Sequence, residues 1–367
     1  MNGERPGEHE HKHQSHERVA RAAQPGTNRK AAHTGGGYPN TEAASQFLRS
    51  TTHRRRAPHA FARPGAADRA SNLLPPVHDP ISYFQAVILG LLQGVAEPFP
   101  VSSLGHGVIL PRLVGWNIHQ NDKFFLTFLV ATHLATAIVL LGFFLKDWVR
   151  IARGLGRSLR DREIGERDHD ARLGWLLVVG TIPAGVVGLL LETPLRSLFA
   201  SAPSAAAFLI VNGVVLLIFE RLRARAPTAE DHLGDSDPRI ARLTWRQAIA
   251  VGTSQATALV PGISRSGMTM GGGLLAGLSN EDAARYGFLL ATPIIGAAAL
   301  LKLPELLGPA GNGVRGPALV AALCAALTTF FAVKFLLRFF ETNRLTPFGI
   351  YCIVAGVICT LVFALGG

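Results

Sequence analysis

The pattern of apolar and polar positions changes near residue 80. Residues 1–80 are polar and contain no apolar run long enough to form a core. From residue 81 onward, runs of about twenty apolar residues alternate with short polar stretches, and a run of that length crosses a bilayer as a helix. Several such runs exclude a soluble protein. The pattern predicts spanning helices at Phe124–Leu145, Leu173–Leu191, Ser204–Phe219, Ala284–Leu301, Ala318–Leu337 and Pro347–Ala364.

Two further apolar stretches are interrupted in the middle. Ile81–Trp116 is broken between Glu97 and Ser103, and Trp245–Leu278 is broken between Pro261 and Gly267. Non-helical backbone at membrane depth persists only where protein or a water-filled cavity satisfies its polar groups. Each stretch therefore predicts a re-entrant helix–loop–helix.

The order of these segments, a broken pair and three spans, occurs twice. We therefore predict an all-α polytopic membrane protein, residues 81–367, with two repeats at about residues 81–220 and 245–365. Three spans is an odd number, so the second repeat is expected to be inverted relative to the first. Broken helices of inverted repeats meet near the bilayer midplane, which would bring the two polar breaks together.

Charge is distributed unevenly along the chain. The net charge is +11, and residues 1–80 hold 12 Lys or Arg and eight of the 13 histidines, a composition typical of a disordered tail. A His-rich metal-binding tract is the alternative for this tail. A basic segment beside a membrane helix favours an anionic membrane surface as its partner, rather than nucleic acid.

The loops also carry charge. Lys146–Arg172 and Arg221–Arg246 hold eight and six Lys or Arg, so the positive-inside rule predicts that both face the cytoplasm. The tail would then lie outside if the first broken pair re-enters, and inside if that pair spans. Arg153–Arg172 is expected to be a solvated amphipathic loop.

A carboxylate lies inside the first broken stretch. Gln93 and Glu97 share one helix face, and a charge at the centre of a membrane helix costs about 2.5–3.5 kcal/mol. A divalent cation held by the oxygens of Glu97 and Gln93 would compensate for it. The alternative is an ion pair with Arg265 that merely joins the repeats. Hydroxyl and imidazole groups suited to acid–base work follow at Ser103 and His106, and Ser102 adds a hydroxyl for substrate binding.

The second break has the composition of a phosphate site. Arg265 presents a planar fork of donors, and the glycines, Gly262 among them, let backbone N–H groups approach an anion. Further hydroxyl donors are Ser264, Ser266 and Thr269. Together the two breaks supply a metal ligand, a base, candidate nucleophiles and a phosphate clamp, which is the set needed to hydrolyse a phosphoanhydride on a lipid.

These motifs resemble those of a known family. QGVAEPFPVSSLGH, residues 93–106, resembles the first motif of bacterial undecaprenyl-pyrophosphate phosphatases of the bacitracin-resistance type, and PGISRSGMT, residues 261–269, resembles their second. The similarity extends over roughly residues 81–367. It implies a multi-pass protein of the bacterial plasma membrane that removes the terminal phosphate of undecaprenyl pyrophosphate. That reaction recycles the lipid carrier for peptidoglycan synthesis and gives bacitracin resistance.

The resemblance also implies roles for individual residues. Glu97 would be the essential acid, Gln93 would occupy a Glu or Gln position, and Arg265 would bind phosphate. Ser103 and His106 would form the nucleophile or acid–base pair, with metal-bound water as a third candidate nucleophile. The hydroxyls beside the arginine would be Ser264, Ser266 and Thr269. The cofactor would be a divalent cation, Mg²⁺ or Ca²⁺.

Some positions depart from the family pattern or stay open. Pro98 stands where an aromatic residue is usual, and Leu104 where a small hydroxyl residue is usual. His133 either lines the cavity or makes an interhelical hydrogen bond. The rival functional class is a transporter or flippase of a lipid phosphate or anion, since inverted repeats with broken helices suit transport equally well. The sequence does not fix the oligomeric state.

Overall fold

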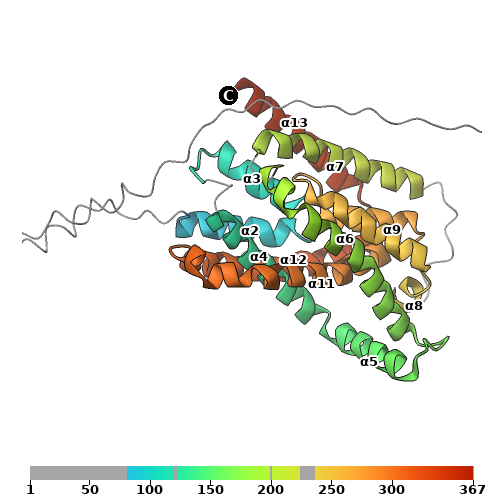
Figure 1. Cartoon of the computed structure of the whole chain (residues 1–367). Coiled ribbons are helices and arrows are strands. Elements are labelled where there is room, and N and C mark those ends of the chain that lie inside the picture. Colours follow the sequence, from blue (N-terminus) through green and yellow to red (C-terminus); the bar gives the residue numbers. More distant parts are fainter. Residues whose placement is uncertain (1–80, 119–122, 199–200, 224–235, 367) are drawn as a thin grey trace, which may run out of the picture. The chain divides into compact units, whose positions relative to one another are not determined.

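The computed structural model describes residues 81–118, 123–198, 201–223 and 236–366. The predicted tail, residues 1–80, lies outside these ranges. Within them all regular structure is helical and no residue forms a β-strand. The described ranges belong to one compact unit, Pro75–Gly367, drawn in Figure 1.

The helices follow the predicted order. The first half of the unit contains α2 (Tyr83–Ala96), α3 (Ser103–Leu113), α4 (Lys123–Phe143), α5 (Leu145–Asp161), α6 (His169–Leu198) and α7 (Ala202–Arg223). The second half contains α8 (Ser236–Ile240), α9 (Trp245–Ala256), α10 (Arg265–Leu275), α11 (Asn280–Leu307), α12 (Arg315–Phe340) and α13 (Thr346–Leu365). Two 3₁₀ turns, η1 (Thr257–Leu259) and η2 (Pro309–Gly311), lie between α9 and α10 and between α11 and α12.

Helix lengths separate two kinds of element. In the described ranges, α6, α7, α11, α12 and α13 are long and apolar enough to cross a membrane, and α4 with α5 would add a sixth span. The protein is therefore a multi-pass membrane protein. By contrast, α2, α3, α9 and α10 have 14, 11, 12 and 11 residues, fewer than the roughly 20 that a bilayer requires.

The segment after α4 differs from the expectation. The prediction of a loop across Arg153–Arg172 was wrong for its first part, because α5 continues as a helix to Asp161 at an angle of 78° to α4. Ile151 is buried, and Trp148 and Leu155 pack against the core, so the apolar residues recur at helical spacing beneath an arginine-rich outer face. The high charge of the segment hid this periodicity.

Close helix contacts determine where the short helices sit. α2 packs against α12, α9 against α6, α4 against α11 and α12, and α7 against α13, as Figure 1 illustrates. The backbones approach closely at glycines: a Cβ on Gly252 of α9 would overlap the carbonyl of Gly180 in α6. Small residues are typical of such interfaces in membranes. The contact holds the end of α9 beside the middle of α6.

An ion-pair cluster joins α5, α8 and α11 at one end of the helices. The carboxylate of Asp237 accepts from Arg285 at 2.8 Å and from Arg150 at 2.6 Å, and Arg285 also lies 3.1 Å from Asp147. Asp237 is only 4% exposed. Burial alone would raise the pKa of Asp237, but the hydrogen bonds and charges of Arg285 and Arg150 outweigh burial and hold that pKa below its ordinary value.

We expect Asp237→Asn to lower the free energy of unfolding by about 2–3 kcal/mol, since two arginines lose a buried charged acceptor. The native pKa of Asp237 is depressed, so its stabilisation is present above the ordinary carboxyl pKa and disappears as pH falls through the native value. Melting temperatures measured in detergent from pH 7 down to pH 3 should therefore fall more steeply in the wild type than in the variant. Asp161→Asn is the control, because its pair with Arg160 is exposed and contributes little. Parallel melting curves for all three proteins would contradict the assignment.

Candidate functional site

The first break ends α2 and begins α3. Glu97 is the C-cap of α2, and Pro98 and Pro100 follow it and prevent the helix from continuing. Ser102 is the N-cap of α3, and Ser103 is that helix's first residue. Ser102 has a φ of 67°, a strained value for a residue other than glycine. The break therefore places a carboxylate and two hydroxyls within one sharp turn.

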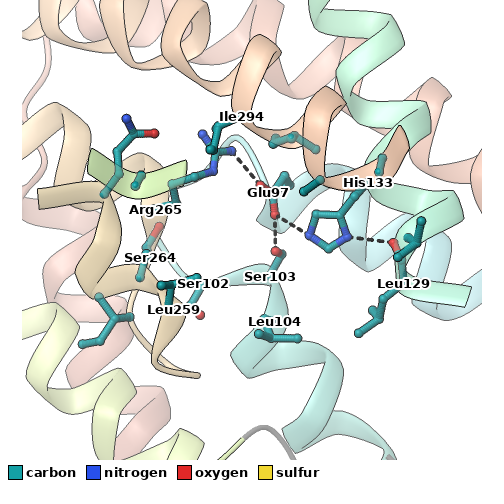
Figure 2. Close-up of a pocket in the computed structure, with 18 of the residues that line it drawn as sticks. Glu97, Ser102, Ser103, Leu104, Leu129, His133, Leu259, Ser264, Arg265 and Ile294 are labelled. Carbon is teal, nitrogen blue, oxygen red and sulfur yellow. Dashed lines mark hydrogen bonds and ion pairs between the residues drawn. The ribbon is translucent and has the colours of Figure 1, made fainter. Parts of the chain in front are cut away.

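The carboxylate of Glu97 is the centre of the site (Figure 2). Its Oε1 accepts from Arg265 Nη2 at 2.6 Å, and its Oε2 accepts a short hydrogen bond from the Ser103 hydroxyl. Gln93 Nε2 donates to the same Oε2 at 3.3 Å, and His133 Nε2 lies 3.4 Å from it. The two polar breaks thus meet, and a carboxylate that is 8% exposed is surrounded by donors.

Arg265 has capacity for a further partner. It is the first residue of α10 and comes directly after the N-cap Ser264. Nη2 is engaged by Glu97, whereas the buried Nη1 has no hydrogen-bond partner among the residues that the structure describes. A buried guanidinium donor normally has an acceptor, and phosphate oxygens match its fork. The second donor is therefore suited to an anion.

Two helices begin at this site with the same local motif. Ser102 accepts from the N–H of Gly105, and Ser264 accepts from the N–H of Gly267, each at 3.2 Å. The N-terminus of a helix carries partial positive charge and favours anions. The starts of α3 and α10 therefore add to the positive potential of Arg265.

A cavity of about 340 Å³ opens beside these groups. One wall is polar and contains Glu97, Ser102, Ser103, His133, Ser264 and Arg265. Apolar residues such as Leu104, Leu259 and Ile294 make other walls (Figure 2). Lys302 and Glu305 of α11 also line the cavity. A polar cluster inside an apolar cavity suits a ligand with an anionic head and an apolar body.

The structure places several predicted site residues away from the cavity. His106 is not among the described residues that line it; its Nδ1 donates to the Ser102 carbonyl and its Nε2 accepts from the Tyr351 hydroxyl, both at 2.8 Å. Ser266 donates to the Phe99 carbonyl at 2.8 Å, and the Thr269 hydroxyl donates to the Arg265 carbonyl at 2.9 Å. These three side chains support the loops, and their direct contact with a substrate stays a prediction.

Gly262 supports the second loop through its backbone. Its φ is +95°, and a Cβ there would meet the backbone of α7 and the side chain of Phe208. It is not one of the described residues that line the cavity. Glycine at this position lets the loop carrying Arg265 lie against α7.

His133 occupies the place in which the sequence suggested His106. It projects from α4, lines the cavity, and donates from Nδ1 to the Leu129 carbonyl at 2.7 Å. Its Nε2 lies 3.4 Å from Glu97 Oε2 and can donate to that oxygen only when both ring nitrogens carry protons. The sequence indicated this role through the position of His133, an ionisable residue inside an otherwise apolar run.

The donor set limits how a divalent cation could bind. Among the described ranges, no group of three or more His, Cys, Asp or Glu side chains could enclose a metal ion. Magnesium is commonly bound through one or two carboxylates together with substrate phosphates. The carboxylate of Glu97, the amide oxygen of Gln93 and the hydroxyl of Ser103 fit a cation that is shared with a phosphorylated ligand.

Comparisons with known proteins identify the family. A model of the bacitracin resistance protein BacA matches residues 86–358. An "Undecaprenyl-diphosphatase" of Mycolicibacterium paratuberculosis is 50% identical over 293 residues, covering 75% of this chain and 95% of the relative. An "Undecaprenyl-diphosphatase 2" of Frankia alni is 42% identical over 341 residues, covering 78% and 99%. One from Granulibacter bethesdensis is 45% identical over 280 residues, covering 74% and 94%. The chain belongs to the BacA family of bacitracin resistance proteins.

Proposed function

We propose that this protein hydrolyses undecaprenyl pyrophosphate to undecaprenyl phosphate and inorganic phosphate in the bacterial plasma membrane. The observation that carries the proposal is the contact of Glu97 with both Ser103 and Arg265 on the polar wall of an otherwise apolar cavity. The reaction returns the lipid carrier to peptidoglycan synthesis. It also removes the pyrophosphate form of the lipid, and this removal gives bacitracin resistance. The relatives' names favour this hydrolysis over lipid or anion transport.

In the proposed mechanism the terminal phosphate binds at the starts of α3 and α10, where Arg265 Nη1 donates to it. Ser103 is the nucleophile, because its hydroxyl already donates to Glu97. The Oγ–phosphorus bond forms, the bond from phosphorus to the bridging oxygen breaks, and the hydroxyl proton passes to Glu97. Undecaprenyl phosphate leaves, and water then hydrolyses the phosphoserine.

A divalent cation, Mg²⁺ or Ca²⁺, is part of the proposal. When bound with the substrate it neutralises the charge of the pyrophosphate oxygens. Glu97, Gln93 and Ser103 would hold it, and Arg265 and the helix N-termini would hold the rest of the anion.

The proposed architecture is two inverted repeats, each with a re-entrant pair of short helices and three spanning helices. Support comes from five pairs of residues at one constant separation along the chain: Ser82/Thr244, Gln85/Gln247, Gln93/Gln255, Ser102/Ser264 and Gly105/Gly267. The first pairs are equivalent capping boxes, and Ser102 and Ser264 are equivalent N-caps. Each half's first short helix packs on the middle long helix of the other half, α2 on α12 and α9 on α6.

The central test is phosphate release from undecaprenyl pyrophosphate by the full chain purified in detergent. We expect steady turnover with added Mg²⁺ or Ca²⁺ and loss of turnover in EDTA, restored by readdition of the cation. Unchanged turnover in EDTA would show that the reaction does not need a divalent cation. Lipid flipping in vesicles without any phosphate release would favour the transporter.

Ser103→Ala tests the nucleophile. We expect phosphate release to fall by about 100-fold or more, as for other activated nucleophiles. In the wild type, rapid acid quenching during turnover should trap a phosphate on Ser103, detectable by mass spectrometry. Ser201→Ala, at a half-buried position near the start of α7, is the control. Turnover by Ser103→Ala at the wild-type rate would assign the attack to water.

A further inference from the structure

A buried amide on the second short helix pair has a property that the mechanism above does not use. Gln255, on the last turn of α9, is 3% exposed and lines the same cavity as Glu97 and Arg265. Its Nε2 donates to the Gly180 carbonyl at 3.2 Å. Its Oε1 is buried and accepts from none of the residues that the structure describes.

An unsatisfied buried acceptor costs about 1–3 kcal/mol, so a group that would satisfy it is expected. The amide cannot simply turn over, because Gly180 offers only a carbonyl oxygen and therefore fixes Nε2 on that side. Oε1 is thus the oxygen that lacks a donor among the described residues. Phosphate oxygens are acceptors, so the ionised substrate does not supply that donor.

Comparison with the other half of the chain explains why this amide is available. Gln93, at the equivalent position, donates to Glu97. The residue that corresponds to Glu97 in the second half is Leu259, which also lines the cavity. Gln255 therefore has no carboxylate to position, and its side-chain oxygen can accept a hydrogen bond from another group.

We propose that Gln255 is a positioning residue for the water that attacks phosphorus, an inference that rests on the proposed function. The water donates one hydrogen bond to Oε1 and turns a lone pair toward the phosphate held by Arg265. Its oxygen bonds to phosphorus, and the bond from phosphorus to Ser103 Oγ breaks. Oγ recovers its proton from Glu97, and the water loses one proton to solvent and keeps the other in hydrogen phosphate. Gln255 takes no proton itself.

The test measures how the phosphoryl group partitions between water and added glycerol during turnover of undecaprenyl pyrophosphate. Gln255→Met removes the acceptor, so we expect the ratio of inorganic phosphate to glycerol phosphate to fall about tenfold, the factor that one hydrogen bond supplies. Phosphoserine at Ser103 should accumulate in the same variant. Gln255→Glu keeps an acceptor oxygen but cannot donate to Gly180, so its ratio should stay near that of the wild type.

Gln247→Met is the matched control. Gln247 lies on the same helix and also donates to a backbone carbonyl, that of Ala276 at 2.9 Å, but does not line the cavity. Its ratio of inorganic phosphate to glycerol phosphate should equal that of the wild type, even if the variant is less stable. If Gln255→Met keeps the wild-type ratio of inorganic phosphate to glycerol phosphate, Gln255 does not position the attacking water. The same conclusion follows if the variant needs more cation but its ratio is unchanged. A wild type that releases no phosphate would instead refute the proposed function.

Discussion

Glu97→Gln is expected to reduce phosphate release from undecaprenyl pyrophosphate by about 1000-fold, within the range for loss of a general base. The variant keeps the shape of the side chain but removes the negative charge that faces Arg265 at 2.6 Å. It also removes the base for the Ser103 proton, and it weakens the proposed cation site. The measurement is single-turnover phosphate release by the full chain in detergent with saturating Mg²⁺.

Two further variants make this result interpretable. Glu166→Gln alters an exposed carboxylate in the loop between α5 and α6 and should leave the rate unchanged. Arg265→Lys keeps the positive charge but loses the planar fork, so substrate binding should weaken while the protein stays folded. Wild-type turnover by Glu97→Gln, with an unaltered melting temperature, would eliminate the proposed chemistry and leave the Glu97–Arg265 pair a structural tie between the two halves.

The second large effect is expected from Gly262→Ala, which should lower the free energy of unfolding by roughly 2–5 kcal/mol. Alanine is strained at the φ of +95°, and its Cβ would lie 2.7 Å from Phe208 Cβ and 2.8 Å from the Leu209 nitrogen. The loop must then move away from α7. Arg265 lies three residues further along, so phosphate release should fall with the melting temperature.

Gly277→Ala separates the two causes. Gly277 has almost the same φ, +94°, but no atom lies within 4 Å of the place its Cβ would take. This variant should show only the backbone cost, about 1 kcal/mol, with full activity. If both alanine variants melt at the same temperature, the contact of the loop with α7 is not what positions Arg265.

Several features could be predicted from the sequence because burial imposes them. A carboxylate and a guanidinium within apolar stretches require partners, and Pro98 and Gly262 mark where the helices break. The meeting of the two breaks was expected because broken helices of inverted repeats meet near the bilayer midplane, and it is confirmed by the contact between Glu97 and Arg265. The inverted relation of the halves stays a prediction.

The direction of individual side chains could not be obtained in the same way. Ser103 and His106 share a helix face, yet the ring of His106 turns to Tyr351 on α13, a helix far along the chain. His133 faces Glu97 because α4 packs against α11 and α12, which no local pattern specifies. Likewise, the unsatisfied oxygen of Gln255 depends on Gly180 of another helix.

The pairing of Glu97 with Arg265 has a consequence for when the protein is reactive. In the substrate-free protein each charge is the counter-ion of the other, and Nη2 of the arginine occupies one oxygen of the carboxylate. In the proposed mechanism the incoming pyrophosphate accepts from Nη1, which the described residues leave without a partner, and so competes with Glu97 for the positive charge of the guanidinium. In the proposed mechanism Glu97 is thus released for proton transfer only when phosphate is bound, so the substrate-free site keeps its reactive groups paired with each other.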